Sequence, residues 1–517
     1  MKEKIVNACF CGIFFIIILT LGGVNLKNLT MQMNNNKGNL TVLESGYNEQ
    51  FFGKTVLTDI YGLTQRLLNK QLIGNFEFFK DDAGIMHPMA SSTYSGEQGE
   101  AFAEDVIKLN SILEEKGIPM AYIQIPSREQ EGYSAYPSGI FDETREVIDA
   151  VLNELKSAGV ICLDMGEACR TGEAGFEKEE FFFSTDLHLT TDAELWVGSR
   201  MVDFLRETAG CEIDSFVMDK HNYRKETYSF VGNLSRSSGK FYTRKDEFDI
   251  YYPDFETSFS LDNRIQGTER SGSFEQVVMN GLAESDYNDY TYWVVNYLQF
   301  TSPYYTIHNN LQSRNRILFI MDSMCFRAVS YLTLGCEEIT ILDPRFFGGV
   351  DYINMVIEEN EYDAVILCHE SSLLPYSLFP EEKNRQELSE LEIMDEAQNG
   401  SLDYCNDVWT ENRAEIQVNL SEAFTELRGW SADVGAGLPG QALYLQIGSH
   451  LIRCDYGLDS GSVAAFFCNE NLGNVGFSVR IPNILFKNME DPTFIILVVS
   501  ADGEKIIPSI QYTVKVE

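Results

Sequence analysis

Ser323 is the residue whose type and position most clearly could do chemistry. It follows residues 317–321, five consecutive apolar residues that are long enough for a strand buried on both faces. From residue 326 the apolar positions change to helical spacing. A serine at such a strand-to-helix turn lies at the carboxyl edge of a parallel sheet, where open α/β sheets bind ligands. Ser323 could therefore be a nucleophile, or Asp322 and Ser323 could be only a helix N-cap pair.

His188 is the second candidate, because this chain has only six histidines and this one stands two residues after Asp186. An aspartate at that spacing can accept the Nδ1 proton, which fixes the tautomer and leaves Nε2 free as a base. A serine, a histidine and an aspartate that meet in space supply a nucleophile, its base and the group that orients the base. The alternative is a satisfied polar histidine. Thr190 or Thr191 is expected to cap the helix that follows.

Strands and helices alternate on both sides of these residues. The alternation predicts an α/β fold with a parallel sheet and helices on both of its faces. Residues 210–315 are irregular and rich in aromatic side chains, and we expect them to be a long insertion that covers the site. The expected strands are 118–125, 160–164, 316–321, 338–342 and 364–368, and the expected helices are 101–116, 141–158 and 352–359.

Several blocks of the sequence resemble a known family in the order in which they occur. Residues 185–190, Thr-Asp-Leu-His-Leu-Thr, resemble the Thr-Asp-x-His-Trp-Thr motif of the alginate O-acetylation proteins and of the DHHW-type proteins, which belong to the SGNH-hydrolase superfamily. The resemblance covers roughly residues 45–380. Its further blocks are residues 230–239, 249–257, Asp322-Ser323, 341–347 and 362–367.

The resemblance implies an SGNH-hydrolase-like fold and a Ser323-His188-Asp186 triad, without a cofactor. The backbone N–H of Ser323 would stabilise the oxyanion, with Gly232 or Asn233 as a second donor. Substrate binding is expected from Arg345 and Thr190, although Arg345 could equally be a structural partner of Asp343.

Two positions depart from the family pattern. Leu189 stands where the family usually has tryptophan, and Met321 stands where many relatives have glycine. Leu189 could loosen the wall beside the histidine, and Met321 could crowd the turn or point into the core. Neither residue removes a proposed catalytic group.

The N-terminus predicts a membrane anchor. Lys2 and Lys4 precede about 20 mostly apolar residues, 5–24, a length that can span a bilayer with the remainder of the chain outside the cell. A cleaved signal peptide, and thus a secreted protein, is the alternative. Residues 26–44 are polar and rich in asparagine and are expected to form a stalk.

Charge and cysteine content exclude some functions. The chain has 78 acidic and 39 basic residues, and its net charge of −39 argues against nucleic-acid binding, which needs a basic surface. No Cys/His cluster has the spacing of a metal site, and the acidic residues 381–396 are expected to form a solvated helix or linker rather than a metal site. Buried thiols are expected at Cys162, Cys336 and Cys368, and Cys454 could pair with Cys468.

Beyond the acidic segment, short alternating strands predict a β-sandwich. It could bind carbohydrate, with Trp430 or Tyr456 stacking on sugar rings, or these aromatic residues could belong to the core. One of the expected strands covers residues 463–467. The predicted organisation is an anchor at 1–25, a stalk and first helix at 26–90, the SGNH-like domain at 91–385, an acidic linker at 386–409 and the sandwich at 410–517.

The expected function is O-acetylation of a cell-surface polysaccharide outside the cytoplasm, with acetyl groups delivered by a membrane-bound O-acyltransferase. This expectation follows from the resemblance, because the same triad also serves hydrolysis. A carbohydrate esterase of the same fold and a non-catalytic glycan-binding surface protein are the two alternatives.

Overall fold

A computed structural model provides the structure. It describes residues 15, 19–27, 51–74, 76–82, 84–89, 94–128, 143–176, 178–265, 267–279, 303–347, 349–395, 397, 399–411, 413–487 and 489–516. Most of the predicted anchor and stalk lies outside these residues. Within the part of the chain that is described, no helix is long and apolar enough to cross a membrane. The anchor therefore remains a prediction from the sequence.

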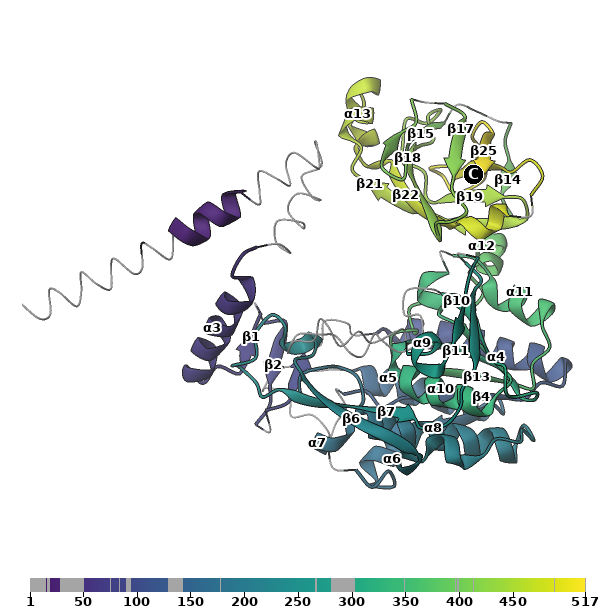
Figure 1. Cartoon of the computed structure of the whole chain (residues 1–517). Coiled ribbons are helices and arrows are strands. Elements are labelled where there is room, and N and C mark those ends of the chain that lie inside the picture. Colours follow the sequence, from purple (N-terminus) through teal and green to yellow (C-terminus); the bar gives the residue numbers. More distant parts are fainter. Residues whose placement is uncertain are drawn as a thin grey trace, which may run out of the picture.

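A mixed sheet of eight strands forms the centre of the chain (Figure 1). Its strand order is β5-β4-β13-β11-β12-β10-β8-β9, and the first five of these strands run parallel. These are the five strands expected from the apolar runs of the sequence. Their bounds are β4 Met120–Gln124, β5 Ile161–Asp164, β11 Arg316–Met321, β12 Glu338–Leu342 and β13 Ala364–His369.

The predicted insertion at 210–315 contributes to this sheet. Its strands β10, β8 and β9 continue the sheet beyond β12 in antiparallel pairing. The expectation of an irregular insertion was therefore wrong, because three of its segments form strands of the central sheet. A two-stranded ribbon, β6 with β7, completes the region. The bounds are β6 Tyr223–Phe230, β7 Asp246–Pro253, β8 Phe259–Asn263, β9 Thr268–Gly272 and β10 Tyr304–Asn309.

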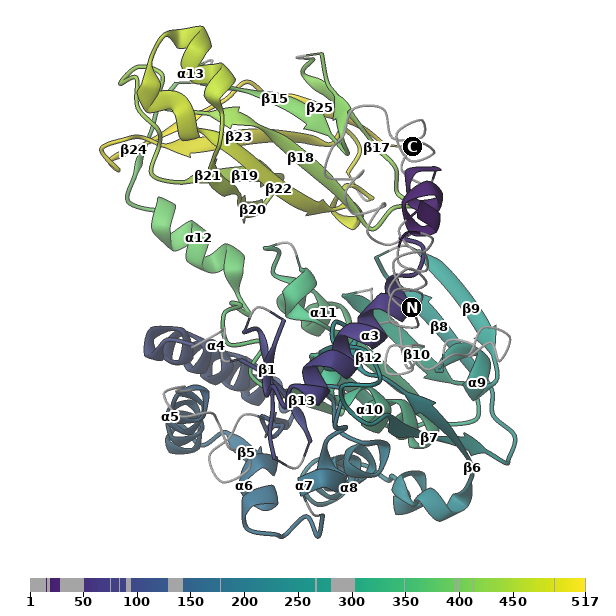
Figure 2. The same cartoon turned by 90° about the vertical axis from the view of Figure 1, so that its left-hand side faces the viewer.

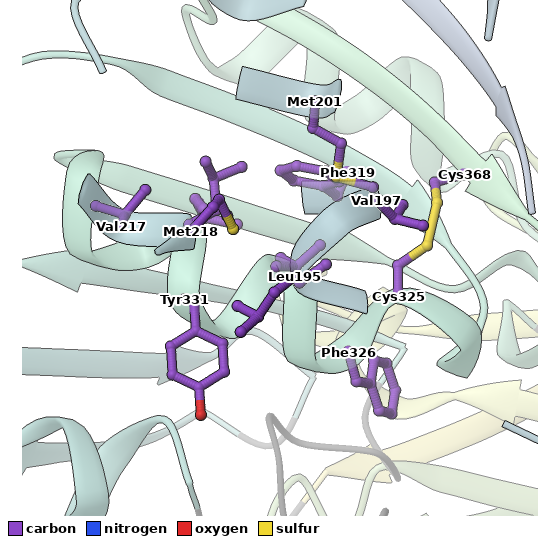
Figure 3. Close-up of a cluster of buried hydrophobic side chains, with 14 of the residues drawn as sticks. Leu195, Val197, Met201, Val217, Met218, Phe319, Cys325, Phe326, Tyr331 and Cys368 are labelled. Atoms are coloured by element: carbon purple, nitrogen blue, oxygen red, sulfur yellow. A yellow bond between two sulfur atoms is a disulfide. The ribbon is translucent and has the colours of Figure 1, made fainter. Parts of the chain in front are cut away.

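Alternate residues of β11 pack against helices on opposite faces of the sheet, as the two-residue period of a strand requires. Leu318 and Ile320 belong to an apolar cluster with the helices α4, α5 and α11. Phe319 belongs to a cluster with α8 and α10, and Figure 3 shows it beside Met201 of α8. The turn that carries Ser323 is thus held from both faces. The helix bounds are α4 Gly96–Glu115, α5 Thr144–Ser157, α8 Thr191–Glu207, α10 Phe326–Leu332 and α11 Tyr352–Glu359.

Two further sheets form the C-terminal part, which lies above the central sheet in Figure 1. One has seven strands and the other five, and side chains from both enclose a shared apolar core. Residues 463–467, expected as a strand, lie instead in helix α13 (Gly461–Phe467). A short apolar run does not separate the two structures by periodicity, and the paired alanines favour a helix. The strands are β14 Glu392–Ile393, β15 Gly400–Cys405, β16 Val408–Trp409, β17 Glu415–Val418, β18 Phe424–Ser431, β19 Leu443–Ile447, β20 His450–Arg453, β21 Asp455–Leu458, β22 Gly476–Pro482, β23 Thr493–Val499, β24 Lys505–Pro508 and β25 Tyr512–Val516.

The acidic segment connects the two parts of the molecule and is only partly solvated. Its first half is helix α12 (Pro380–Leu388), which lies between the central sheet and the C-terminal sheets (Figure 2). The Glu381 carboxylate is buried, and its Oε1 lies 2.8 Å from His450 Nδ1. The Asn384 side chain donates to the backbone carbonyl of Leu451 at 2.7 Å. These contacts correct the expectation of a fully solvated acidic helix.

The cysteines also differ from expectation. Cys368 is not a free thiol, because it forms a disulfide with Cys325 (Figure 3). The disulfide was missed because Cys325 and Cys368 meet only when β11 pairs with β13. Cys454 is buried and Cys468 exposed, and both are free. Cys162 and Cys336 are free thiols, of which Cys336 is fully buried.

Candidate active site

Ser323 lies at the carboxyl end of β11, where the strand turns into a short 3₁₀ helix and then α10. Asp322 caps this turn, since its Oδ1 accepts a hydrogen bond from the Met324 N–H at 2.9 Å. The N-cap role that sequence analysis left open for both residues is therefore filled by Asp322. The Ser323 hydroxyl is directed elsewhere, with its Oγ 3.1 Å from His188 Nε2. Among the described residues, nothing accepts a hydrogen bond from the Ser323 backbone N–H.

His188 lies in the loop that precedes α8, between Ser323 and Asp186. Its Nδ1 is 2.6 Å from Asp186 Oδ1, and its backbone N–H donates to the same oxygen at 3.1 Å. Both side chains are buried. Burial alone would raise the pKa of Asp186, but the hydrogen bond and charge of His188 and two backbone N–H groups outweigh it and lower the pKa. The carboxylate can therefore stay ionised and hold the imidazole with Nε2 facing the serine.

The Gly232-Asn233 block supports the aspartate. The Asn233 backbone N–H donates to Asp186 Oδ2 at 2.9 Å, and the Gly232 N–H donates to the Thr185 hydroxyl at 2.8 Å. A Cβ at position 232 would lie only 2.3 Å from Asp186 Cβ, so glycine is needed for this close approach. Both backbone amides are engaged within the protein, and the second oxyanion donor stays a prediction from the sequence.

A buried arginine and a half-buried aspartate, both missed by sequence analysis, hold the same loop. The Arg128 guanidinium donates to the carbonyls of Asp186, Ser184 and Met86. On the other side, the Asp246 carboxylate accepts hydrogen bonds from the backbone N–H groups of residues 184 and 185 and from the Thr185 hydroxyl. No local motif could reveal either residue, because their partners are backbone groups 42 to 62 positions away.

A buried ion pair joins helix α8, which follows the His188 loop, to helix α10, which follows Ser323. Glu194, on α8, accepts hydrogen bonds from the backbone N–H groups of Arg327 at 2.7 Å and Ala328 at 3.1 Å, at the start of α10. The Arg327 side chain pairs with the same carboxylate and donates to the Leu189 carbonyl at 2.6 Å. Both side chains are almost completely buried. This pair fixes the distance between the elements that carry His188 and Ser323.

A second set of hydrogen-bonded polar residues lies next to the Ser323 turn, at the end of β13. Asp322 Oδ2 accepts from the Glu370 backbone N–H at 3.1 Å and from the Ser372 hydroxyl at 2.8 Å. Burial raises the pKa of the neighbouring Glu370 carboxyl, and hydrogen bonds from two serines oppose this shift. His369, one residue earlier, is buried with its Nε2 3.0 Å from the Tyr122 hydroxyl. Burial lowers its pKa to about 4.

The two predicted substrate-binding residues are engaged within the protein. The Arg345 guanidinium forms two hydrogen bonds with the Asp343 carboxylate, at 2.9 and 2.6 Å, which is the structural alternative that sequence analysis left open. The Thr190 hydroxyl donates to the Glu180 carbonyl and accepts from the Ala193 N–H, so it caps α8 as expected. The capping role of Thr190 is thus observed, and its role in substrate binding stays a prediction from the sequence.

The two departures from the family pattern are accommodated in the core. Leu189 and Met321 are both fully buried. Met321 ends β11 and packs into the apolar cluster of α8 and α10 rather than crowding the turn. Among the described residues, no group of three or more His, Cys, Asp or Glu side chains could hold a metal ion.

Comparisons with known proteins give structural matches only, since no family model and no curated protein matches the chain. PatB1 of Bacillus cereus, solved with a sulfonyl adduct, shares 18% identity with a TM-score of 0.47, over 58% of this chain and 96% of that one. A DHHW family protein from Eubacterium siraeum shares 18% identity with a TM-score of 0.42, over 57% and 91%.

The O-acetyltransferase domain of Pseudomonas putida AlgJ matches with 9% identity and a TM-score of 0.32, over 58% of this chain and 92% of that domain. The solved structures to which this chain is similar therefore include a DHHW family protein and an O-acetyltransferase domain. At these identities and TM-scores, the function has to be argued from the site itself.

Proposed function

We propose that this protein is an extracytoplasmic O-acetyltransferase that acts on a cell-surface polysaccharide through Ser323, His188 and Asp186. The observation that carries the proposal is the continuous hydrogen-bonded series from the serine Oγ through both imidazole nitrogens to a buried aspartate. Such a series supplies a nucleophile, a general base and the group that orients the base. The acetyl donor is expected to come from a membrane-bound O-acyltransferase.

The proposed reaction has two halves. In the first, Ser323 Oγ attacks the acetyl carbonyl of the donor while its proton passes to His188 Nε2. The bond between the acetyl group and the donor then breaks, and the imidazolium returns the proton to the leaving group. In the second half, a sugar hydroxyl attacks the acetyl-serine and gives its proton to the same nitrogen. The bond between the acetyl group and Ser323 Oγ then breaks, the imidazolium returns the proton to Oγ, and the sugar leaves as its acetyl ester. The Ser323 N–H is the proposed oxyanion donor in both halves.

A carbohydrate esterase would use the same residues with water as the acceptor. The two activities are separated by incubating the protein with p-nitrophenyl acetate in the presence of an oligosaccharide acceptor. A transferase gives acetylated oligosaccharide in mass spectra, whereas an esterase gives acetate alone.

Ser330→Ala is the matched control for Ser323→Ala, since Ser330 lies buried on α10 with its hydroxyl bonded to the Phe326 carbonyl.

The C-terminal sheets offer a separate site for glycan. A cavity of about 750 Å³ there is lined by aromatic side chains, together with the polar side chains of Ser401, Asp403 and Ser462. Flat aromatic faces beside hydroxyl and carboxylate groups suit the apolar faces and hydroxyls of sugar rings. This cavity supports glycan binding as a second function and favours Trp430 over Tyr456, whose hydroxyl is bonded to the Ser431 carbonyl. The aromatic lining residues are Tyr404, Trp409, Trp430, Phe466, Phe467 and Tyr512.

A further inference from the structure

Helix α3 (Lys54–Leu67) packs on the protein with its polar face. Its buried residues are Asp59, Gly62 and Gln65. Asp59 Oδ1 accepts a hydrogen bond from the Lys240 backbone N–H at 3.0 Å. At Gly62 the helix lies so close to its support that a Cβ would lie 1.9 Å from the Ser238 carbonyl oxygen. These contacts fix the rotation of the helix about its axis.

The opposite face of α3 is apolar and points into solvent. Val56, Ile60, Leu63 and Leu67 follow the i, i+4, i+7, i+11 spacing of one helical stripe, and their exposed fractions are 61, 53, 42 and 78%. A globular protein normally directs such a stripe at its core, and a contiguous exposed apolar patch usually marks a contact site. Neighbouring apolar residues that are also exposed are Phe52, Leu57, Tyr61 and Leu68.

The position of α3 in the chain indicates what covers this face. Residues 19–27, the end of the apolar N-terminal run, are helical. Asn25 is buried, and its side chain forms two hydrogen bonds with the backbone of Phe52, just before α3, at 3.3 and 2.7 Å. Leu21 Cδ2 lies 3.0 Å from the place where a Cβ on Gly53 would be. The predicted membrane segment therefore ends against the two residues that immediately precede α3.

Charge separates α3 from the rest of this acidic protein. Asp59 is its only acidic residue and faces the protein, so the exposed side of the helix carries no carboxylate. Lys54 and Arg66 are its basic residues. An exposed apolar stripe on a helix that also carries basic residues and an aromatic residue such as Tyr61 is the pattern of a helix that lies in a membrane interface.

We propose that the apolar face of α3 lies in the interfacial layer of a phospholipid bilayer, directly beside the point where the N-terminal segment leaves it. The inference rests on the predicted membrane segment and does not depend on the proposed enzymatic activity. A helix of 14 residues extends about 21 Å along the surface. The contact would fix the orientation of the folded part relative to the membrane.

The test places a photoactivatable benzoylphenylalanine at position 60 of the full-length chain in phosphatidylcholine vesicles. The matched control carries the same residue at position 311, because Ile60 and Leu311 are both 53% exposed. After irradiation, mass spectrometry should find on the order of tenfold more lipid adduct at position 60 than at 311. Equal lipid labelling at the two positions would overturn the proposal.

Repeating the crosslinking with the same variants in native membranes distinguishes the bilayer from other possible occupants of the apolar face of α3. Lipid adducts at position 60 would support the bilayer, whereas adducts to another membrane protein or to a second copy of this chain would contradict it. Thermal melting shows whether each variant is folded. Should position 60 not tolerate the probe, Leu63→Trp with brominated lipids gives an independent reading. Quenching of its fluorescence supports the proposal, and fluorescence unaffected by bromine contradicts it.

Discussion

The candidate catalytic groups of the central sheet are buried and hydrogen-bonded, whereas four of the six aromatic side chains that line the C-terminal cavity are exposed. Asp186 and His188 have exposed fractions of 0 and 3%, while Trp409 and Phe466 are 48 and 80% exposed. The polar groups of the first region are held by neighbours on several elements. Fixed geometry suits bond formation, and exposed aromatic faces suit an extended ligand that binds in several registers. This difference supports our proposal that the first region carries out chemistry and the second binds glycan.

The largest effect is expected from removing the nucleophile or its base. Ser323→Ala and His188→Ala should each lower p-nitrophenyl acetate turnover by about 10⁴-fold or more, and the double variant should be no worse, because the two groups act as a unit. Melting temperatures should barely change, since Asp322 and not Ser323 caps the turn. Large destabilisation with unchanged turnover would assign Ser323 a structural role and leave glycan binding as the leading function.

The next effect is on stability and concerns the pair that joins the two catalytic elements. Arg327→Met leaves the buried Glu194 carboxylate without its cation and should lower the free energy of unfolding by about 3–5 kcal/mol. The control is Arg453→Met, which breaks an exposed pair with Glu387 and should cost less than about 1 kcal/mol. Urea denaturation measures both. Equal losses would mean that the buried pair does not fix the site.

A pH effect is expected from His369. Its pKa is about 4 in the folded protein and 6.5 when unperturbed, so the unfolded chain binds more protons between these values. This residue's contribution to stability is therefore present above pH 6.5 and decreases as the pH falls toward 4. Between pH 7 and pH 5 the free energy of unfolding should fall about 2 kcal/mol more in the wild type than in His369→Asn. Parallel pH curves from urea denaturation would contradict this prediction.

The smallest effect is expected at the cavity. Trp409→Ala should weaken oligosaccharide binding by about 1 kcal/mol, roughly fivefold, while leaving turnover of p-nitrophenyl acetate unchanged. Phe255→Ala, an exposed aromatic residue outside the cavity, is the control and should leave the affinity unchanged. Isothermal titration calorimetry gives both affinities. If both variants bind equally well, the cavity does not hold glycan.

The parts of the account that the sequence predicted are those with local signals. The strand, turn and helix around Ser323 could be predicted because the spacing of apolar residues differs between a buried strand and a helix. The pairing of His188 with Asp186 could be predicted because the two residues are two positions apart in the sequence. Ser323, His188 and Asp186 still had to be brought together by the fold, and only the structure gives the distances between them.

Other features depend on partners far away in the sequence. Arg128 and Asp246 bind backbone groups of the histidine loop. Contacts of this kind leave no pattern of side chains in the sequence from which they could be predicted. Helix α13 was mistaken for a strand because a short apolar run fits both periods. The local hydrogen bonds of Thr190 and Arg345 could not be predicted either, since a capping threonine and a binding threonine look alike in sequence.

The central claim is that Ser323 carries the acetyl group between donor and acceptor. The most direct measurement is mass spectrometry of protein quenched with acid during turnover of p-nitrophenyl acetate. One acetyl group should be found on the peptide that contains Ser323, and it should be absent from Ser323→Ala and present in Ser330→Ala. An acetyl group on a different residue, or wild-type turnover by Ser323→Ala, would contradict the account.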